Sequence, residues 1–378
     1  MKFPLKEFGG RVDRIKKDMQ KENFDALLIY ADAWRAGDVR YVADYKPFNN
    51  TLFWFPSYMP AAGVLLPREG DPTLFVSTMC IDEAAAISWI EEVKSWTELS
   101  ACLEELKHEI KPRKFGITNK SFIPIPLYDS IAEKLGRPKI EETDIIVKLR
   151  AIKSNLEIKA LKNAGEVACV GMQTAIDETH EGAREVDIAR ASEVAMLSHG
   201  GEGLGFDTIV GSGPRSALMI ARPTERRIKD GDLVYVDLSG LYCGYASDLS
   251  RVMSFGKISA EKKKMLETII YANEEGRKAI KPGVKPSEIH AIVNGAITNA
   301  GYDFKQKGIH ATGCEFGEAV PSCSGPYDVP LQPNMTFVVL SSIFIPRVGG
   351  GRIETLMVVT ATGARTLTPI EHVLHLGK

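Results

Sequence analysis

The first part of the chain alternates between helical and strand-like spacing of its apolar residues. Phe8, Val12, Ile15 and Met19 recur three or four positions apart, which predicts a helix near the start of the chain. A short apolar run at residues 26–30 has the length of a strand. Further strands are predicted at residues 63–66, 73–76 and 114–118, and further helices at residues 81–93, 99–110 and 127–135. This alternation predicts a small α/β domain over residues 1–142.

The remainder of the chain groups its helices and strands into longer blocks. The segments with helical spacing lie within residues 145–176, 186–197, 260–280 and 286–300. Strand-like runs, punctuated by glycine and proline, fill residues 207–255 and 336–367. This order of helices and strands predicts an α+β domain over residues 143–378, with the helices on one side of the strands.

Residues 49–60 interrupt the regular alternation. They read Asn-Asn-Thr-Leu-Phe-Trp-Phe-Pro-Ser-Tyr-Met-Pro, which is aromatic, proline-bearing and too irregular for one helix or strand. One interpretation is a loop that covers a functional site or contacts a partner chain. The alternative is that its aromatic side chains pack into the core, and the sequence favours neither.

The overall composition is that of an ordinary globular protein. Of 378 residues, 44% are hydrophobic and 25% are charged, which supplies apolar material for two cores. The net charge of −2 provides no basic surplus, so we expect neither nucleic acid nor an anionic membrane as a partner. The chain has no signal-peptide pattern and no apolar run of about 18 residues, so we expect no membrane span.

The six cysteines are scattered along the chain and form no Cys-x-x-Cys pair. Such sparse and irregular usage is typical of reduced thiols, so we predict a cytoplasmic protein. The same spacing argues against a zinc ribbon or an iron–sulfur cluster.

Two aspartates belong to the strand-rich region in the second half of the chain. Asp237 lies late in an apolar strand, and Asp248 follows eleven residues later. Gly240 and Gly244 between them allow the chain to reverse, so the two carboxylates can converge from paired strands. A carboxylate so deep in an apolar strand needs a partner or a metal ion. Two hydrogen-bonded structural aspartates fit the same spacing.

His310 and Glu354 complete a candidate set of metal ligands. His310 lies in the segment Gly-Ile-His-Ala-Thr-Gly, and Glu354 follows a glycine run and Arg352. Carboxylate oxygens with an imidazole nitrogen suit manganese, iron, cobalt or zinc. A metal held in this way activates water or polarises a carbonyl group. Taken singly, His310 also fits a structural histidine, and Glu354 also fits an ion pair with Arg352.

Several motifs, taken in order, resemble the creatinase–prolidase–aminopeptidase P superfamily. Residues 149–164 resemble the segment that opens its catalytic domain, and residues 206–240 match the next block of the family. The Asp-x10-Asp spacing, the histidine motif and the Gly-Gly-Arg-Ile-Glu ending follow in the family order. The resemblance is strong over residues 145–368 and looser in the N-terminal domain, around residues 38–45. It implies a C-terminal α+β domain of the pita-bread fold, preceded by a smaller creatinase-type α/β domain.

The resemblance also implies a dinuclear metal site with five ligands. The ligands that have counterparts in this chain are Asp237, Asp248, His310 and Glu354. The fifth, a glutamate in a Glu-Pro-Gly sequence, corresponds to Leu340. In the family arrangement, the missing glutamate and the histidine bind the same metal ion. With Leu340 in place of the glutamate, the ion beside His310 loses a ligand, while Asp237, Asp248 and Glu354 can still hold the other ion. We therefore predict one divalent ion or partial occupancy, with a metal-free site as the alternative.

Two histidines that the family uses around its substrate are also missing. Ile220 stands where the peptidases carry one of them ahead of Arg222-Pro223. Gly317 stands ahead of Glu318, where they often carry the other. These departures favour a hydrolase or lyase that acts on a small non-peptide substrate, for example at a C–N bond. The alternatives are an Xaa-Pro peptidase that tolerates the missing ligand and a catalytically silent binding relative.

Catalytic and substrate-binding residues are predicted on the same basis. Glu354 is the candidate acid/base, and His310 is the second catalytic candidate. Family members are usually homodimers in which the N-terminal domain helps to close the neighbour's site, which implies a homodimer here. Arginine can hold a substrate carboxylate, and aromatic rings can surround an ammonium group. The candidates for these roles, which also fit ordinary surface or core positions, are Arg35, Tyr41, Tyr45, Trp54 and Arg352.

Overall fold

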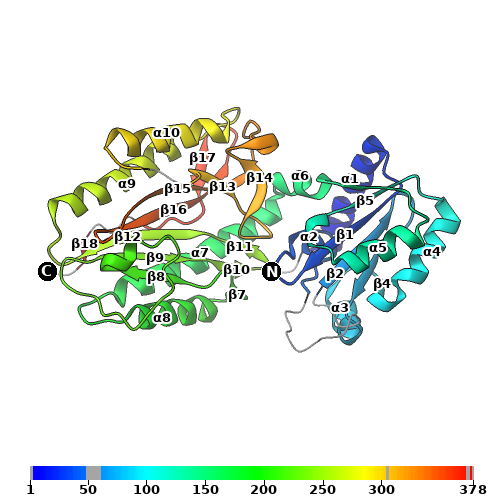
Figure 1. Cartoon of the computed structure of the whole chain (residues 1–378), viewed down its shortest axis with the longest axis horizontal. Helices are drawn as coiled ribbons and strands as arrows, with labels where there is room; N and C mark the ends of the chain where they lie inside the picture. The colour runs from blue at the N-terminus through cyan, green and yellow to red at the C-terminus, as the bar shows by residue number, and fades with distance from the viewer. Residues whose placement is uncertain (1–2, 48–60, 304–305, 372–374, 377–378) are drawn as a thin grey trace. The chain divides into compact units, whose positions relative to one another are not determined.

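Each of the two units into which the chain divides is built around its own β-sheet (Figure 1). The N-terminal unit covers Lys2–Arg150, and the C-terminal unit covers Ala151–Lys378. The computed structural model describes residues 3–47, 61–303, 306–371 and 375–376. Among these residues, no helix combines the length and the apolar character that crossing a membrane requires.

The N-terminal unit is an α/β domain, as the alternating pattern predicts. Its sheet has the strand order β4-β3-β2-β1-β5-β6 among the described residues. The strands are β1 (Ala26–Asp32), β2 (Ala61–Pro67), β3 (Thr73–Val76), β4 (Glu92–Ser95), β5 (Lys114–Ile117) and β6 (Lys139–Glu142). The helices are α1 (Leu5–Glu22), α2 (Gly37–Ala43), α3 (Ile81–Ile87), α4 (Leu99–Ile110), α5 (Ile125–Lys134) and α6 (Ile145–Ala151). The apolar stripe of α1 is buried, which explains why this amphipathic segment is helical.

Two predicted helices have different limits in the structure. The helix predicted at residues 81–93 is wrong at its C-terminal end, because residues 92–95 form β4 and pair in parallel with β3. The helical pattern at residues 145–176 is interrupted, because Ile152 forms a β-bridge with Met335. The next helix then begins after Ser154, whose side chain accepts a hydrogen bond from the backbone of Glu157. In both places a contact distant in sequence overrides the local spacing.

The C-terminal unit has the α+β architecture expected from the order of its elements. Its helices are α7 (Asn155–Asp177), α8 (Glu185–Ser198), α9 (Ala260–Lys278) and α10 (Pro286–Asn299). The strands of its main sheet are β8 (Ile209–Ser212), β9 (Leu233–Leu238), β12 (Leu249–Phe255), β13 (Ile309–Ala311), β14 (Glu318–Ser322), β15 (Thr336–Ile345), β16 (Gly349–Val359), β17 (Ala364–Thr366) and β18 (His375–Leu376). A smaller sheet contains β7 (Gly203–Leu204), β10 (Gly240–Tyr242) and β11 (Tyr245–Ala246).

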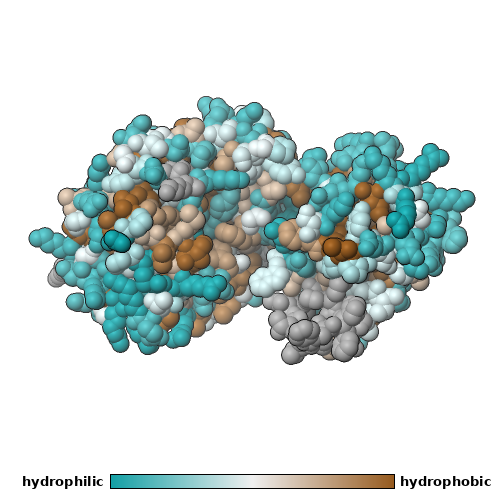
Figure 2. Space-filling view, viewed as in Figure 1, coloured by the Kyte–Doolittle hydropathy of each residue, from teal (hydrophilic) through white to brown (hydrophobic). Residues whose placement is uncertain are grey.

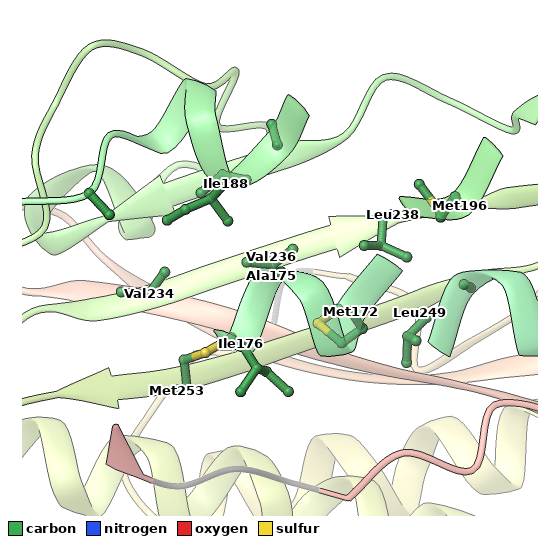
Figure 3. Packing of buried hydrophobic residues seen from close by; sticks show 14 of the residues in the cluster. Met172, Ala175, Ile176, Ile188, Met196, Val234, Val236, Leu238, Leu249 and Met253 are labelled. Carbon is green, nitrogen blue, oxygen red and sulfur yellow. The ribbon is translucent and has the colours of Figure 1, made fainter. Parts of the chain in front are cut away.

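The helices of this unit cover one face of the main sheet. Figure 3 shows Met172 and Ile176 of α7 packed near Val234 and Val236 of β9, within one apolar cluster. Farther along the sheet, Ser341 of β15 donates a hydrogen bond to a backbone carbonyl of α9. Val234 and Val236 are alternate residues of β9, so their side chains point to one face of the sheet. Ser341 of β15 points to that same face. The predicted arrangement, with helices on one side of the strands, is therefore confirmed.

The opposite face of the sheet carries a row of polar and apolar residues. Asp237 of β9 pairs with Ser250 of β12, Ser250 pairs with Glu354 of β16, and Glu354 pairs with Leu340 of β15. Residues directly opposite each other on antiparallel strands point to the same face. His310 of β13 pairs with Val338 of β15, which lies two positions before Leu340. The side chain of His310 therefore points to this face as well. The strand register brings together residues that are more than a hundred positions apart in sequence.

The visible surface divides by polarity (Figure 2). Hydrophilic residues dominate the periphery of the C-terminal unit in this view, and hydrophobic surface gathers nearer its middle. Scattered exposed apolar residues are normal on a folded protein, whereas a local gathering can mark a binding site.

Candidate metal centre

The candidate ligands come from neighbouring strands of the main sheet. Asp237 lies on β9, Asp248 immediately precedes β12, His310 lies on β13 and Glu354 lies on β16. Because these strands are neighbours or near neighbours in the sheet, the register places all four side chains on one face. The structure therefore brings together residues that the sequence selected only by motif and residue type.

Asp248, His310 and Glu354 form the tightest group. One potential ligand atom from each lies within 4.8 Å of the others. The Nε2 atom of His310 is 3.1 Å from Oδ2 of Asp248 and 3.6 Å from Oε1 of Glu354. The two carboxylates are almost fully buried, whereas the His310 side chain retains 24% of its exposure. This group corresponds to the side of the site from which Leu340 removes a ligand.

Asp237 lies beside this group but has protein partners of its own. Its Oδ2 atom accepts a hydrogen bond of 2.9 Å from the hydroxyl of Tyr235 and a second one from the guanidinium of Arg352. The Nε atom of Arg352 is also 3.0 Å from Oε2 of Glu354. Arg352, predicted to bind substrate, therefore connects two carboxylates of the site. No motif in the sequence singles out Tyr235, although its position two residues before Asp237 places both on the same strand face.

The buried oxygens provide a test of whether this site suits a cation. Among the described residues, no well-aligned hydrogen bond reaches either carboxylate oxygen of Asp248, Oδ1 of Asp237 or Oε2 of Glu354, although His310 and Arg352 lie at ion-pair distance from Asp248 and Glu354. Buried polar atoms in folded proteins almost always have a partner, and buried anions require positive charge nearby. Carboxylates and an imidazole are also a suitable donor set for manganese, iron, cobalt or zinc. The residues at this site therefore fit a divalent metal ion.

The electrostatics of the metal-free site reflect this crowding of negative charge. Burial and the neighbouring Glu354 carboxylate raise the pKa of Asp248 to about 6. Burial lowers the pKa of His310, but Asp248 and Glu354 outweigh it and raise that pKa to about 10. Burial raises the pKa of Glu354, but the Arg352 guanidinium outweighs it and holds that pKa below its usual value. Without a metal, Arg352 and a protonated His310 supply the positive charge.

The positions that depart from the family pattern have different surroundings. Leu340 is buried, directly opposite Glu354 in the strand register, so an apolar side chain occupies the ligand position beside the carboxylates. Ile220 is 62% exposed in the loop before β9. A side chain added at Gly317 would meet no atom within 4 Å. The structure therefore has space for a larger side chain at position 317, although the chain carries glycine there.

Aromatic side chains border the histidine. The ring of Phe316 is centred 5.5 Å from the ring of His310 and 4.6 Å from that of Phe206. The loop that carries Phe316 is braced by Glu318, which accepts a hydrogen bond from the backbone of Cys314 and forms a buried ion pair with Lys153 at 2.9 Å. Phe206 and Phe316 are not predictable from the apolar pattern of the sequence, because aromatic residues in loops carry no periodic signal.

The substrate-binding residues predicted in the N-terminal unit have ordinary packing environments. Tyr41 and Tyr45 are buried in its core, and the ring of Tyr41 lies under the guanidinium of Arg11. The guanidinium of Arg35 lies 3.9 Å from the centre of the Phe122 ring. Trp54 and the aromatic segment at residues 49–60 lie outside the described residues. Substrate binding by these residues stays a prediction.

Comparison with protein families gives two adjacent matches. Residues 159–361 match metallopeptidase family M24, and residues 11–152 match the creatinase/prolidase N-terminal domain. Together they correspond to the C-terminal and N-terminal units seen in the structure.

Individual relatives match over nearly the whole chain. An Xaa-Pro dipeptidase of Pyrococcus horikoshii is 30% identical over 96% of this chain and 98% of the relative. An Xaa-Pro dipeptidase of Pyrococcus furiosus is 31% identical over 94% of this chain and 99% of the relative. The crystal structure of the prolidase from Pyrococcus horikoshii superimposes with a TM-score of 0.85, at 29% identity, over 97% of this chain and 99% of that one.

Proposed function

Because the chain belongs to metallopeptidase family M24, we propose that it is a metal-dependent hydrolase that cleaves Xaa-Pro dipeptides with one bound divalent ion. The observation that carries the proposal is the group formed by Asp248, His310 and Glu354, whose buried carboxylates include oxygens that receive no well-aligned hydrogen bond. The names of the relatives support the substrate class. The sequence favoured a non-peptide substrate, and the relatives support its alternative, an Xaa-Pro peptidase, better.

We propose that the ion is held by Asp248, His310 and Glu354. From the sequence, the retained ion was expected beside Asp237. The geometry favours the His310 side, because Oδ2 of Asp237 is engaged by Tyr235 and Arg352. Leu340 withholds a further anionic ligand there, which favours weaker binding than in a complete site. Elemental analysis of protein purified without chelator is expected to find one equivalent per chain, and two equivalents would contradict the proposal.

The proposed reaction is hydrolysis of the peptide bond. A divalent ion held by Asp248, His310 and Glu354 would supply Lewis acidity that polarises a carbonyl or activates water. Glu354 accepts a proton from the attacking water and delivers it to the proline nitrogen as the C–N bond breaks. Arg352 holds the Glu354 carboxylate and favours its ionised form, which suits a proton acceptor. Tyr235 and Arg352 also fix Asp237 in the same row of the sheet.

A second candidate is hydrolysis of a C–N bond in a small non-peptide substrate. It is favoured by the residues that replace the expected histidines, Ile220 and Gly317, because these remove groups that the family uses around peptides. Leu340 further changes the polarity next to Glu354. Ile220 and Gly317 leave Asp248, His310 and Glu354 in place, so they affect the choice of substrate more directly than the capacity to bind a cation.

The test is hydrolysis of Leu-Pro by protein that has been stripped with a chelator and reloaded with manganese, cobalt, zinc or iron(II). We expect proline release that needs added metal and that is much slower with Leu-Gly. Metal-independent release would contradict the metal proposal. If no dipeptide is cleaved although the metal binds, the non-peptide candidate or a silent binding protein would replace the peptidase.

We also propose the domain boundary, assembly and location expected from the sequence. The boundary at residues 142 and 143 would be tested by whether residues 143–378 fold when expressed alone. A homodimer would be tested by light scattering of the purified protein. A cytoplasmic location is supported by Cys80, Cys102, Cys169 and Cys323, which are free thiols, as expected in a reducing compartment.

A further inference from the structure

A cavity of about 490 Å3 lies between the start of α7 and the turn that joins β16 to β17. Sites for small molecules usually have volumes of about 300 to 1,000 Å3, so this cavity has room for a small ligand. Its lining includes three cationic side chains, those of Lys159, Lys162 and Arg365. Among the described residues, no aspartate or glutamate lines the cavity. The charge of its lining is therefore positive.

One wall of the cavity is a single face of α7. Asn155, Ile158, Lys159 and Lys162 follow one another at intervals that place them side by side on the surface of the helix. Asn155 is the first residue of α7, so backbone N–H groups without a partner inside the helix lie at this end. The N-terminus of a helix carries partial positive charge and favours a nearby anion. The helix terminus and the two lysines therefore attract the same kind of ligand.

A second wall comes from the end of the main sheet. Arg365 of β17 is opposite Val358 of β16 in the strand register, so both side chains point to the same face, and both residues line the cavity. Asn334 borders the same space, and its backbone N–H donates a hydrogen bond of 2.9 Å to the carbonyl oxygen of Val359. The third cation is thus supplied by a pair of strands that is distant in sequence from the helix.

These positive charges have few acidic partners. Lys162 forms an ion pair of 3.1 Å with Glu166, which does not line the cavity. Among the described residues, neither Lys159 nor Arg365 has a carboxylate at ion-pair distance. Glu157, the acidic residue in the first turn of α7, is buried and lies outside the lining. Neighbouring cations without matching carboxylates repel one another, so an anion bound among them would stabilise this part of the unit.

The cavity is separate from the candidate metal centre. Val358, in its lining, lies four positions after Glu354 on β16, which corresponds to about 13 Å along a strand. The lining shares no residue with the group formed by Asp248, His310 and Glu354. A small anion in this cavity would therefore not take the place of a substrate at the metal centre, and its binding does not depend on the proposed peptidase reaction.

We propose that this cavity binds a phosphorylated small molecule that carries at least two adjacent phosphate groups. Lysine and arginine bind phosphate oxygens through charge-assisted hydrogen bonds, and the N-terminus of a helix adds backbone donors. Three cations match the charge of a diphosphate better than that of a single carboxylate. Free pyrophosphate and a nucleoside diphosphate present the same group. Ile158 and Val358 in the lining provide apolar surface that only the base of the nucleotide would use.

The first experiment measures binding to the metal-loaded protein by calorimetry. Pyrophosphate and ADP are expected to bind at one site per chain with dissociation constants below about 1 mM, whereas adenosine is expected not to bind. Tighter binding of ADP would identify a nucleotide as the ligand, and ADP no tighter than pyrophosphate would identify the diphosphate group alone. If neither probe binds with a dissociation constant below about 1 mM, the inference is overturned.

Removal of single cations locates the site. Lys159→Gln and Arg365→Gln are each expected to weaken the binding of pyrophosphate by about tenfold, because each removes a charge-assisted hydrogen bond. The matched control is Lys263→Gln, which removes the same charge from an exposed position on α9 that does not line the cavity. Equal weakening by all three substitutions would reveal general attraction of anions to the protein and would overturn the inference.

The same variants exclude binding of the probe at the metal centre. If pyrophosphate binds only to the metal-loaded protein and both Lys159→Gln and Arg365→Gln leave its affinity unchanged, the probe occupies the metal centre and the inference is wrong. If the two substitutions weaken binding alike in metal-loaded and in metal-stripped protein, the cavity is the site. Because the readout is affinity for a probe that is not a peptide, failure of the proposed peptidase function would leave this result unaffected.

Discussion

Asp38 and Asp248 are both buried aspartates, but their carboxylates have very different surroundings. In the N-terminal unit, Oδ1 of Asp38 accepts a hydrogen bond of 2.6 Å from Arg150, and Oδ2 accepts one of 3.1 Å from Asn119. In the C-terminal unit, neither oxygen of Asp248 has a well-aligned hydrogen bond from the described residues, and its nearest cationic partner is Nε2 of His310 at 3.1 Å. A second carboxylate, that of Glu354, lies close to Asp248.

The contrast separates a carboxylate that stabilises the fold from one that serves a site. Among the described residues, eight buried side-chain atoms lack a hydrogen-bond partner, and all belong to the C-terminal unit. Five of the eight belong to Asp237, Asp248, Arg352 and Glu354. Buried polar atoms without a hydrogen bond cost stability. The concentration of such atoms on one face of the sheet therefore indicates a ligand-binding site.

The largest effect is expected for Glu354→Gln. Loss of the proposed proton acceptor and ligand should lower kcat/KM for Leu-Pro by about a thousandfold, equivalent to about 4 kcal/mol of activation free energy. Kinetics of the metal-loaded protein measure it. Glu181→Gln, at an exposed glutamate, is the control and should leave the rate unchanged. If Glu354→Gln lowers kcat/KM by less than about tenfold, Glu354 does not act as the proton acceptor in the proposed reaction.

The second effect concerns the carboxylate that has donors. Asp38→Ala removes the carboxylate that pairs with the buried guanidinium of Arg150 at 2.6 Å and should lower the free energy of unfolding by about 3 kcal/mol. Urea denaturation measures this loss. The control is Asp18→Ala, which removes an exposed ion pair with Lys21 in the same unit and should change stability by less than about 0.5 kcal/mol. Equal losses would show that burial of the pair is not what matters.

The third prediction restores the missing carboxylate. Leu340→Glu should raise the metal content from one to two equivalents per chain, because the new side chain lies opposite Glu354. In the metal-free protein the same change should lower the free energy of unfolding by roughly 2 kcal/mol, since it buries another unpaired anion. Elemental analysis and urea denaturation measure the two effects. Leu340→Gln, similar in shape and uncharged, should leave the metal content at one equivalent.

The smallest effect is expected for Asp248→Asn in the metal-free protein. It should raise the free energy of unfolding by about 1 kcal/mol, because it removes one of the crowded charges and supplies an amide donor to Glu354. Added metal should then stabilise the variant less than the parent, as thermal denaturation would show. A loss as large as that of Asp38→Ala would mean that Asp248 also serves the fold and would weaken the comparison.

The sequence by itself determined the family, the two-part organisation and the identity of the candidate ligands. The helical spacing of Phe8 to Met19 and the Asp-x10-Asp motif depend on residues close together in the chain, so they are legible without a structure. The absence of a carboxylate at Leu340 was equally visible, because the surrounding motifs align the chain with the family pattern. Apolar spacing failed at residues 81–93, where pairing with β3 decides the end of the helix.

Only the tertiary structure decided how the oxygens of those ligands are used. Asp237 and Arg352 are 115 residues apart, and no local pattern predicts that their side chains meet. The same holds for the pairing of Ser342 with Gln306 and for the contact of Phe344 with Tyr235. The physical reason is that residue type and spacing specify which groups are present. Strand register and burial determine which of those groups have a partner and which remain available for an ion or a substrate.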